Sequence, residues 1–264
     1  MSGPTCDDEV TPMAVTSQVG NRLLGALMRY QQEMLKGSPR EDAKSRSLQD
    51  LMKSTWDLSR VRGYVNEVRQ SLISSGMDFI SLKLTTRRKF MGGWSPIYFI
   101  TEVPLAWDLI LEVPYIPGSQ AKGVVRDAFL EVSGDDKMVD CVFGSREAEG
   151  KATFTDFYPV ASQGGLLAYD IINPHYSPRR RPFDEYNANP VPVKFVAVNS
   201  GVTFEGFVVF RRGELESCGQ DSFKLLLQAL FYSSMSGWGR RATKGYGELD
   251  LQVELGEVKS GAGR

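Results

Sequence analysis

Histidine and cysteine are scarce in this chain of 264 residues, and its net charge is close to zero. It contains one histidine, His175, and three cysteines, Cys6, Cys141 and Cys218, with no C-x-x-C pair. Because the cysteines are odd in number and far apart, we expect neither a disulfide framework nor a zinc site. The same scarcity favours a reducing, cytoplasmic location and a protein that works without a metal or other cofactor.

The chain also lacks a strong excess of charge and an apolar start. The net charge of -1 excludes a uniformly basic nucleic-acid binder, so a nucleic-acid surface would have to be local, with acidic residues elsewhere. Residues 1–10 contain three acidic side chains and no apolar run. We therefore expect neither a signal peptide nor a membrane span there, and no membrane attachment.

Hydrophobic periodicity divides the chain into four regions. Residues 15–78 repeat apolar side chains at helical spacing and are predicted to form N-terminal helices. Residues 79–255 alternate strand patterns with helical ones, whereas 1–14 and 256–264 are predicted to be disordered tails. Strands with interposed helices favour an α+β fold, namely a ferredoxin-like (RNA-recognition-motif-like) domain with insertions.

Individual elements follow from the same patterns. Strands are predicted at 79–85, 107–113, 153–158, 166–172, 193–198, 202–210 and 248–255. Helices are predicted at 18–30, from 48 and again from 61 onward, at 119–132 and at 223–231, with a polar break at 37–46. The turn residues Asn199-Ser200-Gly201 predict that 193–198 and 202–210 pair as a hairpin.

A first glycine-rich basic segment, P-G-S-Q-A-K-G-V-V-R, occupies 117–126 and opens the predicted helix. Ser119 is expected to cap this helix, and Lys122 and Arg126 share one of its faces. A helix start with nearby cations suits phosphate, because its N–H groups and its dipole attract anions. The alternative is an ordinary capped helix with a solvated basic face.

A second such segment, G-W-G-R-R-A-T-K-G-Y-G, occupies 237–247. Arg240, Arg241 and Lys244 supply charge without acidic neighbours, and Trp238 and Tyr246 could stack on bases. The alternative is a connector whose aromatic side chains pack inward. Neither segment matches the phosphate loop of nucleotide hydrolases or the dinucleotide fingerprint, so a nucleic-acid backbone is the favoured polyanion.

Two further basic clusters are predicted to contact RNA. Arg87 and Arg88, near Gly92-Gly93, form one with their lysine neighbours. Arg179 and Arg180 lie in a proline-bounded loop between two aromatic residues, which favours RNA or a partner subunit. The alternative for both is a solvated charged face, which is the commoner role of charge runs.

Candidates for catalysis are few. His175 could act as a general base in RNA cleavage, but it has no second histidine to pair with, which favours a structural role in its loop. Asp156 and Asp170 lie on strand-like segments without metal-ligand spacing, so we expect them to cap a helix or support a turn.

Together these segments resemble the RAMP proteins of CRISPR systems. The family has a P-G-S-x-x-K-G-x-x-R helix start and a C-terminal G-x-G-x-x-x-x-x-G-Y-G loop, which 117–126 and 237–247 match. The segments D-I-I-N-P-H-Y at 170–176 and N-P-V-P-V-K-F at 189–195 are similar to a narrower group, the sixth Cmr subunit of type III-B effector complexes.

The resemblance implies a non-catalytic subunit that holds the guide (cr)RNA near its 3′ end in antiviral defence against foreign RNA. Implied partners are the target RNA and other Cmr subunits: the backbone RAMP, the capping RAMP and a small helical subunit. The guide contacts that the motif positions imply are Ser119, Lys122, Arg126, Gly239, Arg240, Arg241, Lys244 and Gly245.

Two other functions stay open at this point. One is a RAMP-type endoribonuclease that processes guide RNA with His175 as base. The other is an interaction module that joins other subunits through exposed apolar and aromatic residues and has no RNA contact of its own.

Overall fold

The computed structural model describes residues 21–93, 100, 101, 103, 105–172 and 192–256. The central strand of its main sheet is β1, Asp78–Thr86. β1 pairs antiparallel with β8, Val202–Phe210, on one side and with β9, Leu249–Gly256, on the other. Two short strands, β4 (Thr153–Phe154) and β5 (Tyr158–Ser162), pair with the far edge of β8, also antiparallel.

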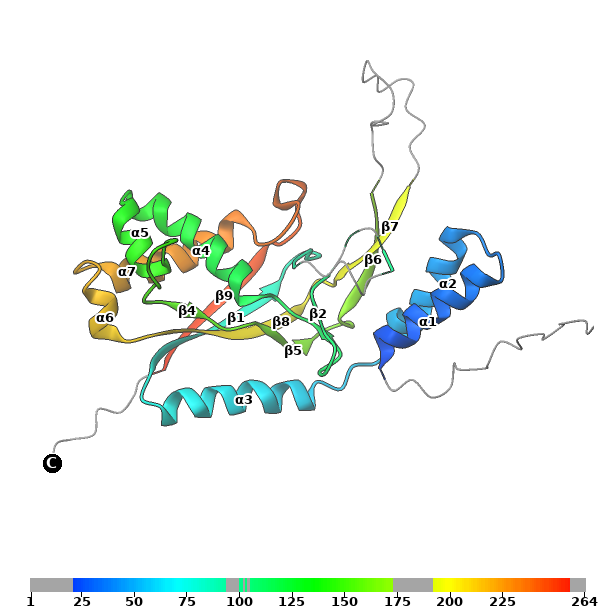
Figure 1. Ribbon diagram of the computed structural model, residues 1–264, viewed down its shortest axis with the longest axis horizontal. Helices are drawn as coiled ribbons and strands as arrows, with labels where there is room; N and C mark the ends of the chain where they lie inside the picture. Colours follow the sequence, from blue (N-terminus) through cyan, green and yellow to red (C-terminus); the bar gives the residue numbers. More distant parts are fainter. Residues whose placement is uncertain (1–20, 94–99, 102, 104, 173–191, 257–264) are drawn as a thin grey trace, which may run out of the picture.

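Two helices cover one face of this sheet. α4, Gly118–Ser133, lies between β1 and β4 in the chain, and α7, Ser222–Ser236, lies between β8 and β9. They pack side by side above the sheet (Figure 1). The resulting β-α-β-β-α-β order, with antiparallel neighbours throughout, is the connectivity expected of a ferredoxin-like unit. The predicted α+β class is confirmed.

Alternation along β1 explains how the sheet is covered on both sides. Ile80, Leu82 and Leu84 are fully buried, and they point toward α4 and α7 because successive side chains in a strand face opposite ways. Ser81 points to the other face, where Arg69 of α3, Ser59–Ser74, contacts it. Figure 1 shows α3 on the opposite side of the sheet from α4 and α7.

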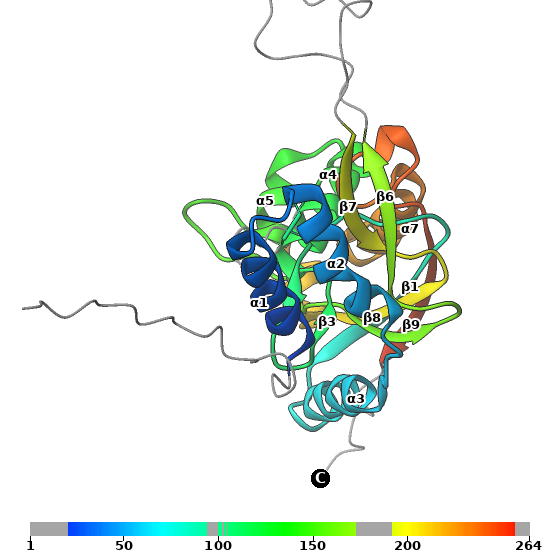
Figure 2. The same cartoon turned by 90° about the vertical axis from the view of Figure 1, so that its right-hand side faces the viewer.

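The predicted N-terminal helices are present. α1 spans Arg22–Leu35 and α2 spans Arg40–Lys53; the apolar pattern from 61 onward belongs to a separate helix, α3. The polar break is shorter than expected, because α2 begins directly after Pro39. The pair α1–α2 lies at one end of the molecule in Figure 1, the end that faces the viewer in Figure 2. Among the described residues no helix has the length and apolar character needed to cross a bilayer.

The prediction of one strand over 107–113 is wrong. The chain forms β2 (Trp107–Asp108), turns, and returns as the short antiparallel β3 (Val113–Pro114). Asp108 causes the turn, since its carboxylate accepts the N–H groups of Ile110 and Leu111, each at 2.8 Å. An aspartate that binds the backbone two and three residues ahead stabilises a turn at the expense of an extended strand.

The predicted hairpin between 193–198 and 202–210 is also wrong. β7, Val193–Val198, pairs with β6, Leu167–Ile172, in a separate two-stranded ribbon that projects from the sheet (Figure 1). The intervening turn is held at one end by the residue before β6 and at the other by the end of β1. Asn199 N–H donates to Leu166 O at 2.9 Å, and Gly201 N–H donates to Thr86 O at 2.7 Å. The turn therefore passes the chain from the ribbon to the sheet.

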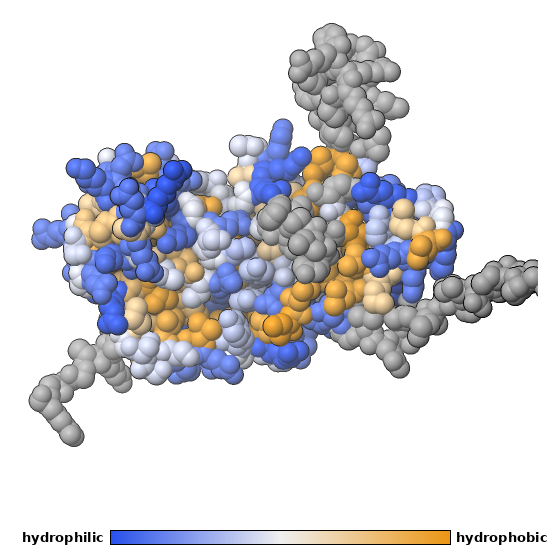
Figure 3. All heavy atoms as spheres, in the orientation of Figure 1, coloured by the Kyte–Doolittle hydropathy of each residue, from blue (hydrophilic) through white to orange (hydrophobic). Residues whose placement is uncertain are grey.

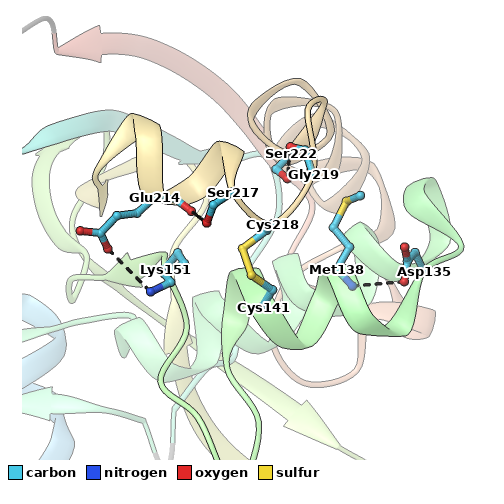
Figure 4. The surroundings of a disulfide bond; sticks show 9 residues. All are labelled: Asp135, Met138, Cys141, Lys151, Glu214, Ser217, Cys218, Gly219 and Ser222. Carbon is cyan, nitrogen blue, oxygen red and sulfur yellow. Dashed lines mark hydrogen bonds and ion pairs between the residues drawn. A yellow bond between two sulfur atoms is a disulfide. The ribbon is translucent and has the colours of Figure 1, made fainter.

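One disulfide is present, although the number and spacing of the cysteines predicted no disulfide framework. Cys141 of α5, Asp136–Phe143, is bonded to Cys218, which follows α6, Arg212–Glu216 (Figure 4). Their Cα atoms lie 5.6 Å apart although 77 residues separate them in sequence. Spacing alone could not reveal the pair, because only packing of α5 against the α6–α7 connection brings the two cysteines together.

The predicted tails fall almost entirely outside the described residues; only Gly256, the end of β9, is described. Figure 3 shows hydrophilic and hydrophobic areas side by side on the face that it draws. The division of the chain into an N-terminal helical region and a second domain at 79–255 stays a prediction.

Candidate nucleic-acid interface

The two glycine-rich motifs meet in one groove, although they are far apart in the sequence. Ser119 comes from the first motif, and Gly239 and Arg240 come from the second. The groove has a volume of about 610 Å³ and is also lined by Gly93, Tyr115, Pro117, Gln120 and Val124. Three of the predicted RNA contacts are thereby brought together.

The start of α4 is fixed by an acidic residue from outside the helix. Gly118 N–H donates to Asp156 Oδ1 at 2.7 Å, which confirms the helix-cap role expected of Asp156. Only glycine fits at 118, because a Cβ there would overlap with the carbonyl oxygen of Phe154. The prediction that Ser119 caps the helix is wrong: the N-cap position is Pro117, and Ser119 is exposed at the groove.

The second motif is held against the segment that follows β1. Arg240 N–H donates to Met91 O at 2.7 Å, while the Arg240 side chain is exposed. Gly239 has a φ of 90°, and a Cβ there would overlap with the same carbonyl oxygen. The close backbone approach that Gly239 permits is therefore an approach to the protein itself, and it presents Arg240 to the groove.

Gln120 also lines this groove, and the sequence patterns did not identify it as a site residue. Its Oε1 accepts the N–H of Gly93 at 2.6 Å, so the glycine pair after β1 is tied to the start of α4. Its place at a variable position of the P-G-S-x-x-K motif gave no signal, whereas the Gly92-Gly93 pair did mark a loop.

Trp238 is fully buried and does not face the groove. Its ring packs edge-on against Phe157 at 6.0 Å, and its Nε1 donates to Ser233 Oγ at 3.3 Å. The prediction that Trp238 stacks on bases is wrong, and the inward-packing alternative holds for this residue. A glycine-flanked aromatic residue has no periodic neighbours from which its burial could be read.

Tyr246 links the second motif to β6. Its hydroxyl donates to Asp170 Oδ2 at 2.7 Å, and Lys89 Nζ donates to the same oxygen at 3.1 Å. Partial burial and the bond to Asp170 raise the pKa of Tyr246 to about 12. Partial burial alone would raise the pKa of Asp170, but the hydrogen bonds from Tyr246, Ile171 N–H and Lys89 together lower it.

Comparison with known proteins decides the family. The model of the RAMP superfamily matches residues 95–250, a range that contains both motifs and all the residues of the groove except Gly93. The chain belongs to the RAMP superfamily.

Within the RAMP superfamily, this chain is similar to proteins named Cmr6. It is 28% identical over 236 residues to the CRISPR system CMR subunit Cmr6 of Saccharolobus solfataricus, covering 85% of this chain and 79% of the relative. It is 31% identical over 138 residues to the CRISPR system Cmr subunit Cmr6 of Pyrococcus furiosus, covering 46% of this chain and 38% of the relative. The predicted resemblance to the sixth Cmr subunit is confirmed.

A solved structure agrees with this similarity. The fold matches a chain in the cryo-EM structure of the Type III-B Cmr-beta bound to cognate target RNA, with a TM-score of 0.67 and 25% identity. The match covers 88% of this RAMP chain and 82% of that chain.

The cations of the first RAMP motif lie away from the groove. Lys122 is half-buried and Arg126 is partly exposed, and neither lines the groove. Arg126 instead forms an ion pair with Asp140 of α5 at 3.0 Å. Both pairing partners are partly exposed, so this pair is weak and leaves the guanidinium able to exchange partners.

The cations of the second RAMP motif are more open. Arg241 and Lys244 are exposed on the loop that contains the short 3-10 helix η1, Ala242–Lys244. Gly245, with a φ of 83°, ends this helix and lies beside the Arg88 side chain. This end of the loop therefore extends the positive charge of Arg240 beyond the groove.

The basic cluster after β1 is balanced by carboxylates. Arg87 Nε donates to Asp250 at 2.6 Å, and Arg88 Nε lies 3.5 Å from Glu248. The pairing of β1 with β9 places Asp250 opposite Thr85 and so brings these acids close to the arginines that follow β1, which the sequence alone did not show. RNA contact by Arg87 and Arg88 stays a prediction.

The remaining predicted residues, His175, Arg179 and Arg180, lie outside the described residues. Within the described part of the chain, no group of three or more histidine, cysteine, aspartate or glutamate side chains could hold a metal ion.

Proposed function

We propose that this chain is a Cmr6-type subunit of a type III-B CRISPR effector complex and that it holds the guide RNA near its 3′ end. The observation that carries the proposal is the groove in which the two RAMP motifs meet. Similarity to two proteins named Cmr6, and to a chain of a Cmr complex bound to target RNA, supports it.

Binding in this proposal is directed at the RNA backbone. The guanidinium of Arg240 and the hydroxyl of Ser119 face one groove at the positive end of α4, and Arg241 and Lys244 continue the charge along the loop. Contacts of this kind recognise phosphates and not bases, so guides of any sequence can be held.

Assembly and catalysis complete the proposal. The chain works in the cytoplasm in antiviral defence against foreign RNA, beside target RNA, a backbone RAMP, a capping RAMP and a small helical subunit. It binds RNA without cutting it. Cleavage of guide precursors that is lost in His175→Ala would instead identify the endoribonuclease alternative.

The test is guide retention by the assembled complex carrying Arg240→Ala. We expect the guide to bind about three- to tenfold more weakly at low salt, with a salt slope smaller by about 0.7, as for one lost phosphate contact on a single strand. Arg146→Ala is the matched control, because Arg146 is exposed and does not line the groove. Equal retention and equal slopes for both variants would contradict the proposal.

A further inference from the structure

A second polar hollow lies on the other face of the sheet, under α3. It has a volume of about 380 Å³. Its polar lining consists of Arg62, Asn66, Arg69, Lys83, Thr203 and Glu205. Three cations face one carboxylate here. The main sheet separates this hollow from the groove of the two RAMP motifs, since α3 and α4 lie on opposite faces (Figure 1).

The one carboxylate in the hollow is already engaged. Glu205 accepts hydrogen bonds from the Arg69 guanidinium and from Ser81 Oγ, the latter at 3.3 Å. Arg69 also donates to Ser81 Oγ at 3.0 Å and lies over the Phe207 ring at 5.3 Å. These contacts hold Arg69 and Glu205 together, and Arg69 Nη1 also lies 3.6 Å from the exposed Glu254.

Lys83 is thereby left without an anion. It lies on the central strand β1, directly opposite Glu205 on β8 and the neutral Gln252 on β9. Because Glu205 is taken by Arg69, Lys83 has no hydrogen-bond or ion-pair partner among the described residues, although it is half-buried. A partly desolvated ammonium without an acceptor favours binding of an anion from solution.

Arg62 connects this hollow to a neighbouring one. It lines both, and the second hollow, of about 470 Å³, also contains Trp56. The Trp56 ring is held in place by an edge contact with Trp107 at 5.7 Å and by Arg22 over the ring at 4.7 Å. Arg62 is thus shared by the hollow that contains Lys83 and the hollow that contains Trp56. Cations bind the phosphate of a nucleotide, and an indole ring can stack on its base.

We propose that the groove between α3 and the sheet binds a nucleotide unit, with its phosphate at Lys83 and Arg62 and its base in the hollow beside Trp56. The unit is either a free nucleoside phosphate or one nucleotide of an RNA strand. Asn66 and Thr203 line the phosphate side and supply further donors. This site does not depend on the groove of the two motifs.

The test measures binding to the full chain with two probes, AMP and a fluorescent 12-nucleotide oligouridine. The variant is Lys83→Gln, with Arg62→Gln as a second variant. Lys137→Gln is the matched control, because Lys137 is exposed on α5 and lines neither hollow. Thermal unfolding of each variant checks that it folds. RNA binding is measured in an Arg240→Ala background to reduce the contribution of the first groove, and each variant is compared with Arg240→Ala alone.

We expect Lys83→Gln to weaken binding about three- to tenfold while Lys137→Gln leaves it unchanged. Loss for AMP and oligouridine alike identifies a free-nucleotide site; loss for oligouridine alone identifies an RNA-strand site. Unchanged affinity for both probes in Lys83→Gln and Arg62→Gln would overturn the inference. The proposed guide-holding function fails separately, through Arg240→Ala in the assembled complex.

Discussion

Tyr246 donates a hydrogen bond of 2.7 Å to Asp170, and this contact joins the glycine-rich loop to β6. Tyr246 belongs to the G-Y-G end of the second motif, and Asp170 begins the D-x-x-N-P-H-Y segment. Two sequence signatures that look independent are therefore two ends of one contact. Lys89, from the segment after β1, donates to the same carboxylate at 3.1 Å.

Replacing either partner is expected to loosen the loop. Tyr246→Phe and Asp170→Asn should each lower the free energy of unfolding by about 1–3 kcal/mol, because each removes a hydrogen bond to a charged group. Their effects should be less than additive in the double variant, as measured by urea unfolding. Tyr232→Phe, at an exposed tyrosine of α7, should change little. Fully additive losses would show that the bond contributes nothing.

Asp170 should also give the protein an acid-sensitive component of stability. Its pKa is lowered in the folded chain, so below about pH 4 the unfolded chain binds the proton first and folding loses this stabilisation as the pH falls. Wild type should therefore lose stability more steeply than Asp170→Asn between about pH 4 and pH 2. Chemical unfolding at a series of pH values measures the difference; parallel curves would contradict the assignment.

Two glycines should respond to alanine in opposite directions. Gly247 has a φ of 74°, and a Cβ there would overlap with the carbonyl oxygen of Trp238, so Gly247→Ala should destabilise the protein by more than about 1 kcal/mol. Gly123 lies inside α4 with open space around its Cα, so Gly123→Ala should stabilise by about 0.5–1 kcal/mol. Thermal unfolding of both variants gives the comparison, and a stable Gly247→Ala would argue against the described loop.

The disulfide predicts how many cysteine thiols react before and after reduction. Of three cysteines, Cys141 and Cys218 are bonded, so the denatured chain should show one reactive thiol without reductant and three after reduction. Cys141→Ser should lower the free energy of unfolding by about 2–4 kcal/mol under oxidising conditions, because the bond closes a long loop. Cys6→Ser is the control. Three reactive thiols before reduction would show that the bond does not form in solution.

Local patterns predicted the elements better than their partners. Alternation located β1 and β9, and helical spacing located α4. The pairing of β7 was missed because the Asn-Ser-Gly turn is a local signal, whereas β6 competes from more than twenty residues away in sequence. Motif content named Ser119, Gly239 and Arg240 as candidate contacts. Their meeting in one groove, and the diversion of Arg126 toward Asp140, depend on how distant elements pack and could not be predicted from the motifs.

The two different faces of β1 limit which sequence changes the fold can tolerate. It separates a leucine-lined side under α4 and α7 from a side that carries Ser81 and Lys83 under α3. Deleting a single residue in β1 would exchange the two sides, moving Lys83 into the core and leucines into the polar hollow. Both neighbouring strands fix the register, so neither could compensate alone. The length of this strand should consequently vary less than its composition among proteins that keep both surfaces.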